Sequence, residues 1–181
     1  HIPFQSGSNK ILKAMNRGYT REKYLELVAM IRRYVPEAAI TTDIIVGFPG
    51  ETEADFNDTL NLVKEVGFDA AFTFIYSKRS GTPAALMEEQ VPLDVKKARL
   101  NLLMEAQNIS SVQRNEALVG KTLEVLAEGP SNNNEKVWSG RTRTNKLVLW
   151  PVEGREFELG DKVQVQIETA QTWLLKGKAV E

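Results

Sequence analysis

The chain has 181 residues, 42% of them hydrophobic, which is enough for one ample core or two modest ones. The 23 Lys and Arg residues nearly balance the 24 Asp and Glu residues, so the overall charge favours neither nucleic acid nor a membrane surface. With no Cys and one His, the sequence excludes disulfides, thiolate metal sites and a Ser-His-Asp triad within these residues. No apolar run approaches the roughly 18 residues that span a bilayer, and no signal-peptide pattern is present, so we expect a soluble, cytoplasmic protein.

The first two thirds of the chain alternate between helical and strand-like patterns. A short apolar segment at 2–5 precedes a helix predicted near 9–16. Thr20 can cap a second helix, which Pro36 ends. The apolar positions of this second helix recur with a 3.6-residue period at Tyr24, Leu27, Val28, Ile31 and Val35.

The next segments repeat this alternation. A strand is predicted over 38–48, followed by a helix that Thr52 caps, with Asp55 in the position of a capping box. Gly67 suits the left-handed residue that ends this helix, and an aromatic strand follows at 68–77. The buried stripe of the helix is predicted to be Phe56, Leu60 and Val63. Short connections between such elements predict βα units in a parallel sheet or barrel.

The composition changes near residue 118. Pro92 opens a long helix up to that point, and its predicted buried face comprises Val95, Ala98, Leu102, Ala106, Ile109 and Val112. Five short strand-like runs then follow at 122–129, 137–142, 146–150, 161–169 and 172–180, with a predicted hairpin tip at 131–136. This spacing is typical of a small OB-like β-barrel. The sequence therefore predicts an α/β domain over 1–118 and an all-β domain over 119–181.

A carboxylate opens the strand TTDIIVG. Strand side chains alternate, so one face carries Thr42, Ile44 and Val46 and the other carries Thr41, Asp43, Ile45 and Gly47. An unpaired Asp43 on an inward face would cost several kcal/mol, so it needs a partner. We consider two interpretations: an internal ion pair with an Arg, or a cavity in which Asp43 binds a polar ligand.

Two neighbouring segments carry polar groups at strand ends. Residues 50–52 follow the strand at the edge where βα barrels place their sites, although a turn and a helix cap are the favoured explanation of this common pattern. Gln5 and Ser6 end the first apolar segment, and Arg17 follows a short helix. An amide, a guanidinium and the Asp43 carboxylate from adjacent units can together bind a zwitterion, or each can be a surface residue.

Three blocks then identify a family by resemblance. HIPFQSGSNKILKAMNRGYT, TTDIIVGFPGETEADF and FIYSKRSGTPAA resemble, in order and spacing, the radical S-adenosylmethionine (SAM) methylthiotransferases, and the segment 120–180 resembles the TRAM domain that ends such enzymes. The similarity is greatest to the members that act on isopentenyladenosine in tRNA. The resemblance implies an α/β fold consisting of the later βα units of a partial TIM-type barrel, followed by a TRAM barrel.

The resemblance also implies a cofactor site. Arg17 matches the position that faces the methionyl carboxylate of SAM, and Gln5 and Asp43 match positions that hold polar groups of methionine or ribose. The segment from Ile45 to Gly47 matches the strand beside the adenine. The implied cofactor-binding residues are Gln5, Ser6, Arg17, Asp43, Ile45 and Gly47.

The family's cluster-binding cysteines are missing from this chain. Its members use a CxxxCxxC loop and three further Cys to hold two 4Fe–4S clusters. We therefore expect the clusters to be ligated outside this chain. The chain itself is expected to be a C-terminal portion of the enzyme that is inactive alone and contains no catalytic residue. The implied enzyme methylthiolates C2 of isopentenyladenosine next to the anticodon, and its partners are the tRNA anticodon stem-loop, a sulfur source and an electron donor, with no membrane.

RNA binding is expected in the all-β domain. The implied contacts are Arg141, Arg143, Asn145 and Lys146, near Trp138 and Trp150, with Arg79 at the barrel rim against RNA phosphate or the cofactor. The alternative is a solvated β-turn, since nine basic residues in 119–181 are offset by nine acidic ones. The aromatic side chains of Phe72, Phe74 and Tyr76 are predicted to be core.

Several other functions compete with this interpretation. One sibling acts on threonylcarbamoyl-adenosine in tRNA, and another acts on a ribosomal-protein aspartate but does not typically show the HIPFQSGS block. A non-catalytic RNA-binding fragment, or an unrelated βα protein with a β-barrel tail, belongs to a different class.

Overall fold

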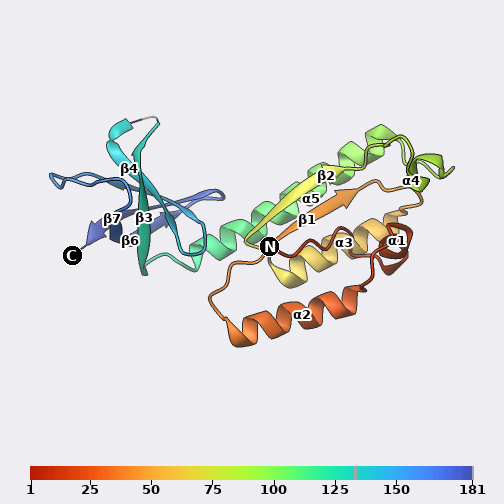
Figure 1. The fold of residues 1–181 in the computed structure, drawn as a ribbon, viewed down its shortest axis with the longest axis horizontal. Coiled ribbons are helices and arrows are strands. Elements are labelled where there is room, and N and C mark those ends of the chain that lie inside the picture. The colour runs from red at the N-terminus through yellow and green to blue at the C-terminus, as the bar shows by residue number, and fades with distance from the viewer. Residues whose placement is uncertain (133, 181) are drawn as a thin grey trace. The chain divides into compact units, whose positions relative to one another are not determined.

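The computed structural model describes residues 1–132 and 134–180 and divides into two compact units, residues 1–110 and 111–181 (Figure 1). The predicted domain boundary at residue 118 stays a prediction. The predicted hairpin tip at 131–136 includes residue 133, which lies outside the described residues.

The first unit consists of βα units. Its elements are α1 (Asn9–Ala14), α2 (Arg21–Tyr34), β1 (Thr41–Val46), α3 (Glu53–Val66), β2 (Ala70–Ile75), α4 (Pro83–Leu86) and the first part of α5 (Leu93–Glu116). The predicted caps are present: the Thr20 hydroxyl accepts a hydrogen bond from the N–H of Lys23, and Thr52 and Asp55 form a capping box. Gly67 ends α3 in the left-handed conformation, with φ of 58°. The short helix α4 was not predicted from the sequence.

The strands β1 and β2 form a parallel pair in which Asp43 lies opposite Phe72 and Ile45 lies opposite Phe74. The segment before α1 extends this pair by a single parallel bridge between Gln5 and Ile44. Helix α3 connects the two strands, as a βα crossover requires. The carboxyl ends of β1 and β2 therefore lie at the same edge of the sheet, next to the segment that carries Gln5.

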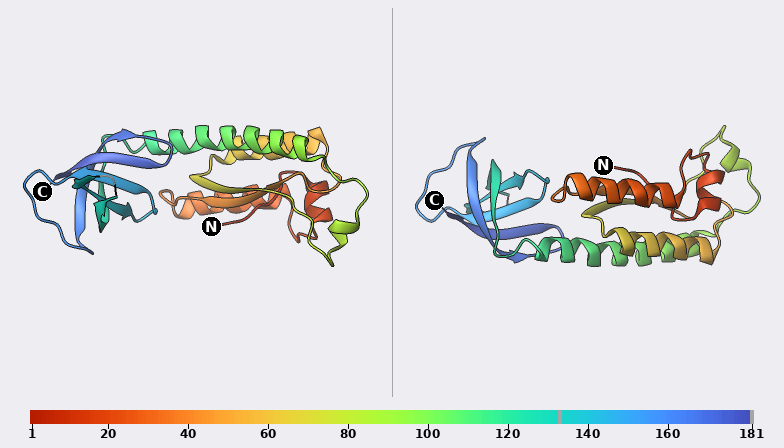
Figure 2. Two further views of the ribbon diagram at one scale, coloured as in Figure 1. Left: turned by 90° about the horizontal axis from the view of Figure 1, so that it is seen from above. Right: turned by 90° about the horizontal axis from the view of Figure 1, so that it is seen from below.

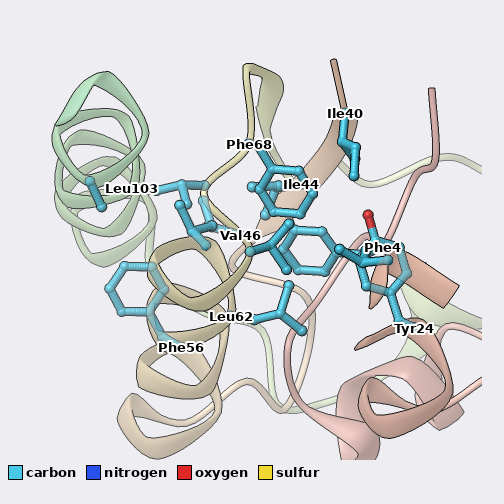
Figure 3. Packing of buried hydrophobic residues seen from close by; sticks show 13 residues of the cluster. Phe4, Tyr24, Ile40, Ile44, Val46, Phe56, Leu62, Phe68 and Leu103 are labelled. Atoms are coloured by element: carbon cyan, nitrogen blue, oxygen red, sulfur yellow. The ribbon is translucent and has the colours of Figure 1, made fainter. Parts of the chain in front are cut away.

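One face of this sheet packs against α3 and α5, which Figure 2 shows on the same side of the strands. Ile44 and Val46 of β1 are fully buried there, together with Phe56 and Leu62 of α3 and Leu103 of α5 (Figure 3). Phe4 and Phe68 stack with their ring centroids 5.5 Å apart. The predicted apolar face of β1 is thus the core face.

The opposite face corrects one prediction. Phe72 and Phe74 were predicted to be core, but 60% and 51% of these residues are exposed. They share a face with Asp43 and Ile45, whereas the helices cover the other face, so no helix packs on their rings.

The predicted buried face of α5 was wrong in part, although Ala106 is buried as predicted. Leu102 and Ile109 are exposed, and the side chains of Lys96, Arg99 and Leu103 are buried instead. The two buried cations have partners in the segments that follow β1 and β2, and these contacts decide which side of the helix faces inward.

The second unit is a closed five-stranded barrel with strand order β3-β4-β5-β7-β6. Its strands are β3 (Thr122–Ser131), β4 (Asn134–Thr142), β5 (Leu147–Pro151), β6 (Lys162–Ala170) and β7 (Leu174–Val180). All pairs are antiparallel except β5 with β7. The core is formed by Val125, Val148, Trp150, Val165 and Leu175, all fully buried. The predicted fold class, βα units followed by a small β-barrel, is confirmed.

No helix in the described part of the chain has the length and apolar character that crossing a membrane requires.

Candidate functional site

A cavity of about 890 Å³ lies in the first unit and is lined by Gln5, the end of α1, the exposed face of β1 and β2, and the segment from Tyr76 to α4. Five residues singled out from the sequence line it: Gln5, Arg17, Asp43, Ile45 and Arg79. They come from four segments that are up to 74 positions apart in the chain. The fold therefore brings together polar groups whose proximity the sequence alone did not establish.

Gln5 is held rigidly at the cavity wall. Its N–H donates to the carbonyl of Asp43 at 2.9 Å, and its own carbonyl accepts the N–H of Ile45 at 2.9 Å. Its φ of 66° is in the left-handed region, which is uncommon for a residue other than glycine and is retained where the surroundings determine it. Gln5 as a residue is 6% exposed and lines the cavity, so it contributes a buried polar group there.

Asp43 and Ile45 point to the same side of β1. The Asp43 carboxylate lies 3.4 Å from the imidazole of His1 and lines the cavity. Because the Asp43 carboxylate contacts His1 and lines the cavity, the structure favours the interpretation that Asp43 is a cavity residue over the interpretation that it forms an internal ion pair with an Arg. Ile45, the buried Phe48 and the exposed ring of Phe74 supply an apolar wall beside these polar groups.

Two guanidinium groups complete the lining. Arg17 follows α1, and the left-handed residue Asn16, with φ of 57°, turns the chain so that Arg17 reaches the cavity. Arg79 follows β2 in the loop before α4, where its carbonyl accepts the hydroxyl of Thr82 at 2.8 Å. The cavity thus offers two cations, one carboxylate and the side-chain amides of Gln5 and Asn16 beside an apolar wall, a set that suits a zwitterionic ligand with a ring system.

Ser6 and Gly47 are buried but are not part of this lining. The Ser6 hydroxyl accepts the N–H of Ser8 at 3.3 Å and supports the start of α1. Gly47 begins the turn after β1 with φ of 73°, and a Cβ there would lie 2.3 Å from the Lys96 side chain. Their positions next to Gln5 and Val46 give them a structural role behind the cavity.

A buried ion pair holds the turn after β1. Oε1 of Glu51 accepts the N–H of Gly47 at 2.8 Å and Nη1 of Arg99 at 2.8 Å. The side chains of Glu51 and Arg99 are 1% and 8% exposed. Burial raises the pKa of the Glu51 carboxyl, against the opposing effects of the Gly47 N–H and the Arg99 charge. Glu51 of the GFPGET motif is therefore a buried support of the turn and not a group at the cavity rim.

Lys96 supports the other strand end. Its ammonium donates to the carbonyl of Tyr76 at 3.1 Å and lies 4.9 Å from the centre of the Tyr76 ring. Burial lowers the pKa of Lys96, and the nearby charge of Lys78 adds to this effect. Tyr76 in turn contacts Phe48 edge-on, with ring centroids 5.1 Å apart. Both aromatic residues line the cavity, so α5 holds its wall in place.

The four residues predicted to bind RNA in the second unit lie in one hairpin: Arg141 is near the end of β4, and the other three are in the turn between β4 and β5. Arg141 donates to the carbonyl of Asn145 at 3.2 Å, and Asn145 adopts φ of 62°. Arg141 and Arg143 lie 3.5 and 3.6 Å from Glu128 and Glu124, in solvent-exposed ion pairs. Lys146 donates to Oδ1 of Asn115 at 2.8 Å.

The aromatic residues named with this hairpin are placed differently from the prediction. Trp150 is fully buried, and Trp138 packs partly against the barrel core and the ring of Phe157. Neither presents an open ring beside the cations. A Trp that is close in sequence to the cations can still point into the barrel, because neighbouring strand residues point to opposite faces. This part of the prediction was therefore wrong.

Apart from Ile45, sequence reasoning missed the apolar and supporting residues of the cavity. Phe74 and Tyr76 were assigned to the core, and Lys96 and Arg99 were not considered. The only sequence signal for the latter two was their spacing of three positions in a helix, which places both cations on one face. Such a pair is usually solvated, so this signal does not identify a buried position.

Comparison with known proteins gives two domain matches. Residues 1–63 match the radical SAM superfamily, and residues 116–180 match the TRAM domain. The cavity residues Gln5, Arg17 and Asp43 fall in the first match, and the cationic hairpin falls in the second.

Three relatives that are similar over nearly the whole chain share one name. The chain is 59% identical over 181 residues to a tRNA-2-methylthio-N(6)-dimethylallyladenosine synthase of Moorella thermoacetica, covering 100% of this chain and 40% of the relative. Proteins of the same name from Acetivibrio thermocellus and Desulfitobacterium hafniense are each 54% identical over 99% and 98% of the chain, and 37% and 39% of their own lengths. The chain thus spans about two fifths of these relatives. The resemblance is confirmed: residues 1–63 match the radical SAM superfamily, residues 116–180 match the TRAM domain, and the whole chain is similar to a part of proteins named as tRNA methylthiolating enzymes.

Proposed function

We propose that this chain is the part of a tRNA methylthiotransferase that holds SAM and binds the anticodon stem-loop, in an enzyme that methylthiolates C2 of isopentenyladenosine. The observation that carries the proposal is the cavity, in which Gln5, Arg17 and Asp43 meet in a chain similar throughout its length to enzymes of that name. We expect the enzyme to work in the cytoplasm, with a sulfur source and an electron donor as further partners.

The cavity residues fit SAM. The guanidinium of Arg17 suits the methionyl carboxylate, because a planar fork of donors binds both oxygens of a carboxylate. The buried amide of Gln5 and the carboxylate of Asp43 can hold the ammonium or ribose hydroxyls. The apolar surface of Ile45 and Phe74 suits the adenine ring. Arg79 remains available to the cofactor or to an RNA phosphate, from the exposed loop before α4.

The chain's own residues do not fit the 4Fe–4S clusters. The sequence has no Cys, and the described residues include no group of three or more His, Cys, Asp or Glu side chains that could hold a metal ion. The clusters would therefore be ligated by other parts of the enzyme. Bound together, SAM and the clusters supply the radical and the methyl group of the reaction, and this chain orients SAM and keeps its surroundings apolar.

The experiment is mass spectrometry of tRNA nucleosides from cells that lack the gene, complemented with the complete enzyme and its variants. In the deletion strain, the methylthio form of isopentenyladenosine should disappear from tRNA, and isopentenyladenosine without the methylthio group should accumulate. Arg17→Met and Asp43→Asn should each fail to restore it, whereas the wild type and the control Asp58→Asn should restore it, since Asp58 is exposed on α3.

Binding of SAM to the same purified variants separates the cofactor role from folding. We expect both cavity variants to bind SAM at least about 10-fold more weakly, because each removes a charge-assisted hydrogen bond. If the methylthio form of threonylcarbamoyl-adenosine disappears instead, the substrate is wrong and the cofactor site stands. If no nucleoside changes, the tRNA-modifying function is refuted.

A further inference from the structure

The second unit exposes one aromatic ring at the end of the barrel that carries the cationic hairpin. Trp173 is 65% exposed and lies in the bend that connects β6 to β7. Of the three Trp residues in the chain, Trp138 and Trp150 pack in the barrel core. An exposed Trp in a small barrel needs an explanation, because burying such a ring is strongly favourable.

The strand pairing places this Trp beside the hairpin. Strands β5 and β7 pair in parallel with Leu147 opposite Leu174, and Lys146 and Trp173 are the residues immediately before this pair. Both therefore lie at the same end of neighbouring strands. They are 27 positions apart in the chain, which is why their proximity is invisible in the sequence.

Asn115, near the C-terminal end of α5, ties the two segments together. Its side-chain N–H₂ donates to the carbonyls of Gln171 and Thr172 at 2.7 and 3.2 Å, and its side-chain oxygen accepts the ammonium of Lys146 at 2.8 Å. Asn115 itself is 5% exposed. A buried amide that joins both segments holds the Trp-bearing bend and the cationic hairpin in a fixed relation, so the ring and the charges form one surface.

Basic and acidic residues are separated along the barrel, and the basic ones lie at the end that carries Trp173. Residues 139–150 contain three basic and no acidic residues, whereas residues 151–161 contain four acidic residues and one basic residue. Strand β5 separates the hairpin turn from the acidic loop, so they lie at opposite ends of that strand. The ion pairs of Arg141 and Arg143 with glutamates are exposed, and such pairs contribute about 0–1 kcal/mol, so a phosphate can replace them.

From this juxtaposition we propose that Trp173 stacks on an unpaired base of the RNA loop while the Arg141–Lys146 hairpin binds the adjacent phosphates. The partner class follows from the chemistry, since an exposed indole beside cations matches a base next to its phosphates and single-stranded binders combine these two groups. This inference rests on the proposed RNA-binding role and assigns to it a contact outside the cationic hairpin.

The test measures binding of the 181-residue chain to two labelled RNA hairpins of one sequence, of which one has abasic positions in its loop. Trp173→Ala should weaken binding to the intact hairpin by about 10-fold, within the range for loss of one stacked base. Trp173→Phe should recover most of the affinity. Leu159→Ala is the matched control, since Leu159 is also a large exposed apolar residue but belongs to the acidic segment.

Salt dependence and the abasic hairpin distinguish stacking from phosphate contact. Trp173→Ala should leave the slope of log affinity against log salt unchanged. On the abasic hairpin, Trp173→Ala should bind as tightly as the wild-type chain, because no base is available for stacking. Arg143→Gln should reduce the slope by about 0.7 and weaken both hairpins alike.

Other results would overturn the inference. If Trp173→Ala binds both hairpins as the wild type does while Arg143→Gln binds weakly, the stacking role is wrong and RNA binding by the hairpin stands. If Trp173→Ala changes only the self-association of the chain, the ring belongs to a protein interface. If the wild-type chain binds neither RNA at low salt, both the RNA-binding role and the stacking role fail.

Discussion

Glu51→Ala is expected to destabilise the first unit and leave the second unit unchanged. The substitution removes the acceptor of two hydrogen bonds, from the Gly47 N–H and from Arg99, both 2.8 Å long. Arg99 would then be a cation whose side chain is 8% exposed, with the backbone carbonyl of residue 51 at 3.1 Å and the exposed Glu53 carboxylate at 3.4 Å as acceptors.

The magnitude follows from these contacts. Removing one partner of a buried ion pair costs about 3–5 kcal/mol, since the remaining charge is left unpaired. At a typical urea dependence of about 2 kcal/mol per M, a loss of about 4 kcal/mol lowers the unfolding midpoint by about 2 M. Glu53→Gln is the matched control, because Glu53 approaches the same guanidinium but its side chain is 71% exposed, so its loss should cost under about 1 kcal/mol.

The positions of the aromatic residues provide an assay for each unit. All three Trp residues lie in the second unit and all four Tyr residues lie in the first. Urea unfolding followed by Trp fluorescence therefore reports the barrel, and circular dichroism at the helical minimum reports mainly the helices of the first unit. Glu51→Ala should shift the dichroism transition and leave the fluorescence transition in place. A dichroism shift as small as that of Glu53→Gln, or equal shifts of both transitions, would refute the reasoning.

Two further predictions use the same assays. The pKa of Asp55 is lowered to about 2, since burial, which raises it, is outweighed by hydrogen bonds from neighbouring hydroxyls and the Thr52 N–H. Because the pKa of Asp55 is lower in the folded state, its ionised carboxylate stabilises the first unit at pH values above the ordinary pKa of 3.8. About 2 kcal/mol of the unfolding free energy of this unit should therefore be lost as the pH falls from about 4 to about 2. Asp55→Asn should abolish this loss, as measured by urea unfolding at a series of pH values. Gly177→Ala should destabilise the barrel by about 1–3 kcal/mol, because a Cβ there would lie 2.1 Å from the carbonyl oxygen of Gln166. Its fluorescence midpoint should fall while the dichroism midpoint stays; an unchanged fluorescence midpoint would show that β6 and β7 accommodate the methyl group.

Local chemistry accounts for the elements that were predicted correctly. The Thr52 and Asp55 capping box, the left-handed Gly67 and the alternation along β1 each depend on a few adjacent residues, so they are visible in the sequence. The five barrel strands were likewise marked by Gly, Pro and Asn between apolar runs. The order in which these strands close the barrel depends on contacts between distant segments and was not predicted.

The inward side of α5 shows where sequence patterns fail. Counting apolar residues placed Leu102 and Ile109 inside, but the partners of Lys96 and Arg99 lie in segments 20 and 48 positions earlier in the chain. A buried cation is favourable only when a specific acceptor is present, and that acceptor is brought there by tertiary structure.

For this protein, the sequence by itself determined the strands, the helices other than α4, the family resemblance and the candidate ligand groups Gln5, Arg17 and Asp43, because each depends on local pattern or on motif order. Only the tertiary structure decided that these groups line one cavity, that Phe72 and Phe74 are exposed, and that Trp173, not Trp138 or Trp150, lies open beside the cationic hairpin. The physical reason is that burial and proximity are set by which segments pair and pack, and residues far apart in the chain carry no local mark of those contacts.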